Sequence, residues 1–146
     1  MNDQRAQFIE LLQGDNQLLR LLGTNKAFWN EDLPDEARYS ILPVDKVRNG
    51  MNPCFVTVQV SNENLIGTKL TDAFIYVRCY NSTDKTFVNI DKVLSRVKAL
   101  LHNHRFRQYA DNAVSIDTVY ESTGSELRDE AYGMNYRESR YRLLYL

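Results

Sequence analysis

The 146-residue chain has few residues of the kinds that hold metals or react covalently, with two histidines and two cysteines. His102 and His104 share one short segment beside a predicted helix end, and no further His or nearby Cys completes a metal-ligand set. We therefore expect no metal site. Cys54 and Cys79 fall in apolar, strand-like runs, which predicts buried free thiols, with a disulfide as the alternative.

Glycine and catalytic patterns are also sparse. The six glycines are scattered, and none belongs to a GxGxxG or GxxxxGK loop that would bind phosphate. No grouping of Ser, His and Asp, or of Cys, His and an acid, suggests nucleophilic catalysis. We therefore expect a protein without enzymatic activity and without a cofactor.

Long hydrophobic runs are missing as well, because no apolar stretch reaches the ~18 residues of a membrane span. The first ten residues hold acids and amides where a signal peptide would carry a basic segment and then an apolar core. These two absences predict a protein that has no membrane partner.

Neither sign of charge dominates, since 18 basic and 19 acidic residues give a net charge of −1 at pH 7. This balance argues against a dedicated DNA-coating protein, which would be clearly basic. Hydrophobic residues make up 43% and charged residues 25%, as in ordinary globular proteins. The length suits a single domain over residues 1–146.

Two short helices are predicted at the N-terminus, because apolar residues recur with helical spacing in 3–13 and again in 18–22. Gly14 and Gly23 are placed to end these helices in a left-handed conformation, and Asp15 is placed to cap the second one. Residues 24–53 have no sustained period, and we interpret them as a long loop with a short strand near 39–42.

Strand-like composition and alternation predict strands at 54–60, 71–80, 114–121 and 136–146. Between the second and third strands, one apolar stripe with helical spacing predicts a helix over about 86–102. The predicted fold class is α+β: a four-stranded, mainly antiparallel sheet, with the long helix packed on one face and two short N-terminal helices.

This order of elements resembles the tail terminator (tail completion) family of long-tailed bacteriophages over nearly the whole chain. Four segments carry the resemblance. The first two are the leucine-rich paired helices with a Gly break, Ile9–Asp15 and Leu18–Gly23, and the entry into the first strand, Asn52–Val58. The others are the strand-turn-helix unit, Phe74–Tyr80 with Ile90–Leu101, and the closing strand, Gly133–Leu144. The chain differs from compact members in its longer 24–53 segment.

The resemblance implies a structural virion protein located at the head–tail junction and made in the bacterial cytoplasm. Its subunits would form a ring, usually hexameric, that caps the tail tube, ends tail polymerisation and then meets the head-closure or connector protein. DNA would pass through the lumen without specific binding. Two alternatives stay open: another neck component, such as a head-closure or head–tail joining protein, and a small cellular α+β binding module or unrecognised enzyme.

A ring needs two different patches that meet between neighbouring subunits. Tyr and Arg are enriched in protein interfaces, so the aromatic face of the 71–80 strand and the arginine-rich last strand are candidates for the two sides. The candidate interface residues are Phe74, Tyr76, Tyr80, Tyr136, Arg137, Arg140 and Arg142. The alternative is that Tyr76 and Tyr80 cover their own domain.

Acidic residues are candidates for surfaces that face the lumen or the tube, because strong phosphate contacts would hold passing DNA. These candidates are Glu31, Asp32, Asp35, Glu36, Glu126, Asp129 and Glu130. The basic stretch 85–107 would then face outward or toward a neighbour. The alternative is that all of these charges are simply solvated.

Overall fold

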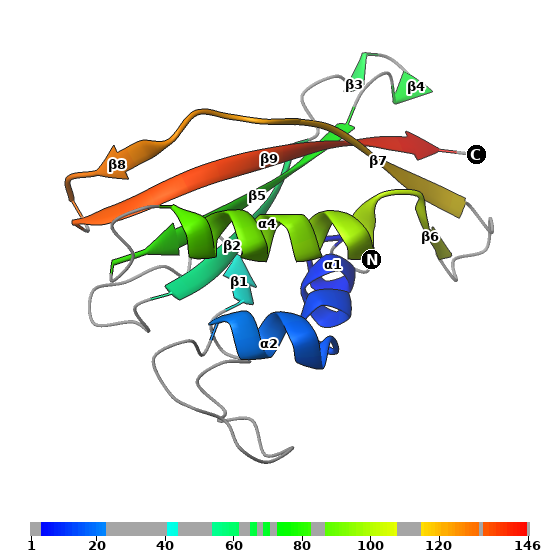
Figure 1. The fold of residues 1–146 in the computed structure, drawn as a ribbon. Helices are drawn as coiled ribbons and strands as arrows, with labels where there is room; N and C mark the ends of the chain where they lie inside the picture. Colours follow the sequence, from blue (N-terminus) through cyan, green and yellow to red (C-terminus); the bar gives the residue numbers. More distant parts are fainter. Residues whose placement is uncertain are drawn as a thin grey trace.

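The computed structural model describes residues 4–22, 41–43, 54–61, 65–66, 69–70, 73–82, 87–107, 115–131 and 133–145, and it has the α+β architecture that the sequence predicts (Figure 1). The described elements are α1 (Gln4–Gln13), α2 (Asn16–Leu22), β1 (Ile41–Pro43), β2 (Cys54–Ser61), β3 (Leu65–Ile66), β4 (Lys69–Leu70), β5 (Ala73–Asn81), α4 (Val88–Leu101), β6 (His104–Arg107), β7 (Ser115–Thr123), β8 (Leu127–Asp129) and β9 (Met134–Tyr145).

The main sheet of the described residues has seven strands, in the order β1-β2-β5-β9-β7-β6, with β8 also paired to β9. All pairings are antiparallel except that of β1 with β2. The four predicted long strands are β2, β5, β7 and β9, but the predicted sheet had too few strands. The short strand predicted near 39–42 overlaps β1, whereas β6 and β8 were not predicted, because strands of three or four residues are too short for alternation to be visible in a sequence.

The described helices lie on one face of this sheet, with α4 running across the central strands, α1 beside β1 and β2, and α2 packed against α4 and α1 (Figure 1). The turn between α1 and α2 contains the predicted cap, because the Asp15 carboxylate accepts a hydrogen bond of 2.8 Å from the Leu18 N–H. Gly14 does not adopt the predicted left-handed conformation, since Gly133 is the one described glycine with positive φ. Gly23 lies outside the described residues.

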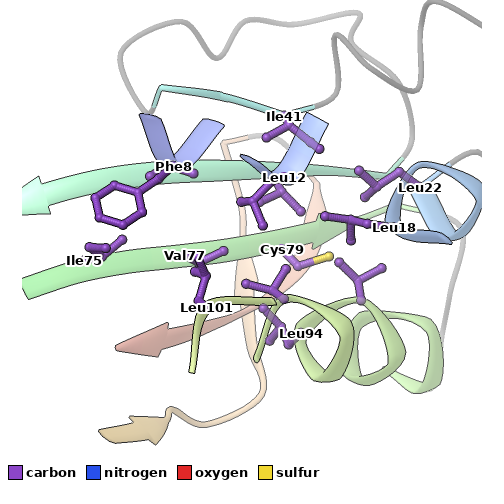
Figure 2. Close-up of a cluster of buried hydrophobic side chains, with 14 of the residues drawn as sticks. Phe8, Leu12, Leu18, Leu22, Ile41, Ile75, Val77, Cys79, Leu94 and Leu101 are labelled. Atoms are coloured by element: carbon purple, nitrogen blue, oxygen red, sulfur yellow. The ribbon is translucent and has the colours of Figure 1, made fainter. Parts of the chain in front are cut away.

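The core forms between this helical layer and the sheet. The helix predicted at 86–102 is α4, and its apolar stripe is buried as expected, namely Ile90, Val93, Leu94, Val97 and Leu101. Figure 2 shows α1, α2 and α4 side chains meeting Ile75, Val77 and Cys79 of β5. Both cysteines are buried free thiols, as predicted, and burial raises the pKa of Cys79 well above its ordinary value.

Candidate functional site

The face of the sheet opposite the helices carries most of the residues predicted to form a subunit interface. Register places Phe74, Tyr76, Arg78 and Tyr80 of β5 beside Arg142, Arg140, Glu138 and Tyr136 of β9, respectively. We call the surface made by these eight residues, together with Glu121 of β7, the open face. It combines aromatic rings, guanidinium groups and carboxylates on three neighbouring strands, β5, β9 and β7.

One end of the open face holds two arginines on a shared carboxylate. Arg140 Nε lies 2.9 Å from one oxygen of Glu121, and Arg142 Nε lies 2.7 Å from the other. Both guanidiniums lie over the Phe74 ring, at 5.2 and 5.9 Å from its centroid. We call these four residues the Arg140–Arg142 cluster. Two positive groups face one negative group, so the cluster keeps one unit of positive charge.

The two arginines of this cluster are oriented and still accessible. Their side chains are 45% and 47% exposed, whereas the Glu121 side chain that holds them is 18% exposed. Glu121 was not among the residues selected from sequence. It lies at a β-bulge between Tyr120 and Ser122 that brings it beside both arginines, and no composition signal marks such a bulge.

The other end of the open face is packed within the chain. Tyr80 is stacked on Phe55 with ring centroids 4.8 Å apart, and its ring centroid is 5.2 Å from that of Tyr136. Arg78 NH1 donates to the Tyr80 hydroxyl at 2.9 Å, and its Nε and NH2 donate to Glu138 at 3.1 and 2.9 Å. Tyr80 is 3% exposed, and this burial raises the pKa of its hydroxyl. Tyr80 therefore covers its own domain and offers a partner almost no surface.

Arg137 lies on the other face of the sheet, in contrast to the rest of the predicted interface set. It donates to Asp91 of α4 at 2.7 Å and to the Gly124 carbonyl at 3.0 Å. It therefore ties the helix to the sheet. The sequence suggested that the aromatic and arginine-rich segments form two separate patches. They do not, because β5 and β9 are neighbours and their side chains share one surface.

The structure describes three of the seven acids predicted to face the lumen or the tube. Glu31, Asp32, Asp35 and Glu36 lie outside the described residues. The other three acids lie in or beside β8. Asp129 accepts a hydrogen bond of 2.9 Å from the Ala131 N–H and so stabilises the turn after β8, whereas Glu126 is exposed and the Glu130 side chain is 85% exposed. Leu127, between them, is 47% exposed.

Four arginine and lysine side chains of the 85–107 stretch are described, and two of them form ion pairs. Arg96 forms two hydrogen bonds of 2.9 and 2.7 Å with Asp15, and Arg105 forms two of 2.8 and 3.2 Å with Asp117. Lys92 and Lys98 are exposed on α4, and the Lys98 ammonium lies over the Tyr120 ring at 4.1 Å from its centroid. A groove of about 680 Å³ runs between α2 and α4, lined by Gln17, Leu21, Val88, Asp91, Lys92, Ser95, Arg96 and Ala99.

Two other kinds of site are absent from the described residues. No group of three or more His, Cys, Asp and Glu side chains there could hold a metal ion. None of the described helices is both long and apolar enough to cross a membrane. The predictions of no metal and no enzymatic activity remain predictions.

Comparison of the chain with family models, with curated proteins and with solved structures finds no match of any kind. The resemblance to phage tail terminators therefore stays an expectation, drawn from the order of elements and from the sequence segments named above. The class of protein that the structure itself defines is an α+β domain with one helix-covered sheet face and one open, arginine- and aromatic-rich face.

Proposed function

We propose that the chain is a structural subunit of a phage tail, which assembles into a ring that caps the tail tube. The ring would end tail polymerisation and provide the surface that joins the tail to the head. The subunit would act in the virion at the head–tail junction and not as an enzyme. Its partners would be other copies of the same chain in a hexameric ring, the tail-tube protein and the head-closure or connector protein.

The observation that carries the proposal is the Arg140–Arg142 cluster. Guanidinium groups that are held in place, stacked on a ring and half exposed are typical of residues that dominate protein interfaces. Because one carboxylate serves two arginines, the cluster has capacity for a further acidic group. A protein whose task is to assemble needs such a surface, and it needs no cleft or reactive group.

The order of elements supports the same proposal. The structure contains the paired N-terminal helices, the β2–β5 pair, the long helix α4 and the β7–β9 pair in the order on which the resemblance to tail terminators was based. In such a subunit α4 and the long strands β2, β5, β7 and β9 would form the rigid body of the ring. The short strands β1 and β6 would lie at the two edges of its sheet.

The test is to add the purified chain to tail tubes assembled from the tail-tube protein of the same phage, and to image them by negative-stain electron microscopy. We expect a ring at one tube end and an arrest of tube growth. Binding to portal-capped heads instead of tubes would identify a head-closure protein. A single subunit at the assembled neck, or continued tube growth with no bound chain, would overturn the proposal.

A further inference from the structure

We propose that the Arg140–Arg142 cluster of one subunit receives the β8 tip of a second copy of this chain. The β8 tip is defined here as Glu126, Leu127 and Glu130. In this contact the two carboxylates bind the half-exposed guanidiniums, and Leu127 packs on the Phe74 ring. The inference rests on the proposed function in one respect only, namely that copies of the chain associate with one another.

Charge complementarity supports this pairing. The cluster has two guanidiniums and one carboxylate, and it therefore retains one positive charge. The β8 strand and its flanking turns carry Glu126, Asp129 and Glu130 against a single base, Arg128. The ion pair between Arg128 and Glu130 is loose, at 3.7 Å, and both side chains are largely exposed. Carboxylates match the planar donor fork of arginine, which forms two parallel hydrogen bonds with them.

An apolar element strengthens the match. Leu127 is 47% exposed and is one of two large hydrophobic residues that are exposed in the described part of the chain. Phe74, on the cluster, is partly exposed and packs near Tyr76 with ring centroids 6.4 Å apart. A leucine flanked by acids thus faces, in the proposed contact, an aromatic ring flanked by arginines. Both sides combine an apolar centre with charged surroundings, as protein interfaces do.

The two patches cannot meet within one chain. Leu127 pairs with Tyr136 at the start of β9, and Arg142 lies six residues further along the same strand, a distance of roughly 20 Å. Figure 1 shows β8 and the C-terminal end of β9 at opposite ends of the sheet. A contact between two different patches repeats from head to tail, and such contacts build closed rings or open filaments. Under this inference Glu126 and Glu130 lie in a subunit contact, in place of the lumen or tube-facing position that the sequence suggested.

A charge-exchange experiment tests the contact directly. The first variant, Glu126→Arg/Glu130→Arg, has a basic tip and a basic cluster; the second, Arg140→Glu/Arg142→Glu, has an acidic tip and an acidic cluster. Sedimentation is measured at up to about 1 mM, which detects weak contacts. We expect each variant alone to associate at least tenfold more weakly than the wild type. An equimolar mixture should regain association, because each tip then meets a cluster of opposite charge.

The control is Lys92→Glu/Lys98→Glu, which makes the same charge change as the second variant on the exposed side of α4. It should associate like the wild type. The first variant changes only exposed side chains, so it tests the β8 tip even if the second variant does not fold. The second variant is at risk because its new acids adjoin Glu121. If it does not fold, Arg140→Gln/Arg142→Gln replaces it and should associate weakly alone. Wild-type association by the tip variant, a folded mixture that stays monomeric, or a wild type that is monomeric at 1 mM would overturn the inference.

The two proposals fail separately. If the wild type caps tail tubes but the charge-exchanged mixture does not recover, the proposed function stands and the contact is wrong. If the mixture recovers but the wild type does not bind tail tubes, the contact stands and the proposed function is wrong.

Discussion

At the scale of single residues, Tyr80 and Tyr76 lie on the same face of β5 in different surroundings. Tyr80 is enclosed by Phe55, Tyr136 and Arg78, whereas Tyr76 is only partly buried. We expect Tyr80→Ala to lower the free energy of unfolding by roughly 3 kcal/mol, since it removes a large packed side chain. We expect Tyr76→Ala to cost about 1 kcal/mol or less. Chemical denaturation of both variants measures the difference.

Equal losses for the two tyrosine variants would show that Tyr76 also serves its own domain. The interface proposal would then depend on the Arg140–Arg142 cluster alone. A larger loss for Tyr76→Ala than for Tyr80→Ala would contradict the packing described for this end of the open face.

Asp15 joins helix capping to an ion pair, and the two contributions are separable. Its carboxylate accepts from the Leu18 N–H and from Arg96, and the contact with Arg96 lowers the pKa of Asp15 below its ordinary value of 3.8. Asp15→Ala should cost about 1 kcal/mol through loss of the cap alone. Asp15→Asn keeps a capping oxygen and loses the charge, so it should cost less than Asp15→Ala.

The pH dependence of this site follows from the lowered pKa of Asp15. A carboxylate whose pKa is lower in the folded state stabilises that state above its unfolded pKa, and loses this effect as the pH falls through the folded pKa. The stability difference between wild type and Asp15→Asn should therefore be constant from pH 7 to about 5. It should shrink below pH 3.8. Thermal melts from pH 7 to 2.5 test this, and a difference that grows on acidification would contradict it.

At the scale of elements, the contact between α4 and the sheet depends on the buried side of the helix. Val97 is fully buried, whereas Ser95, two residues before it, is exposed. Val97→Asp places an unpaired charge in the core and should cost roughly 3–5 kcal/mol. Ser95→Asp is the matched control and should cost about 0.5 kcal/mol through helix propensity. A melting temperature of Val97→Asp equal to that of the wild type would contradict this packing.

The elements that sequence could predict are those with enough residues to show a period. The apolar stripe of α4 repeats over four turns, and β5 alternates over nine residues, so both were found with their buried faces correctly assigned. The short strand predicted near 39–42 overlaps β1, whereas β6 and β8 were not predicted. Each of these two pairs with the strand that follows it, β7 and β9 respectively, but three or four residues are too few to show an alternating pattern.

At the scale of the whole molecule, sequence found most of the residues of the candidate site but not their arrangement. Composition marked the aromatic strand and the arginine-rich strand as separate patches, and only the β5–β9 register shows that they are one surface. Arg137 was included because it lies among the arginines that form this surface. Alternation along β9 sends its side chain to the opposite face, where Asp91 binds it.

The last prediction concerns DNA, which a tail cap must let pass. The chain has a net charge of −1, and two bases of the 85–107 stretch, Arg96 and Arg105, are paired with Asp15 and Asp117. We therefore expect duplex DNA to bind more weakly than about 10⁻⁴ M at physiological salt, the weak limit of non-specific binding. Fluorescence anisotropy with a labelled duplex at several salt concentrations measures this. Micromolar affinity that falls steeply with salt, and that is lost in Lys92→Glu/Lys98→Glu, would show that α4 binds phosphate. In that case the basic stretch, rather than the acids Glu31, Asp32, Asp35 and Glu36, would face the lumen of the ring.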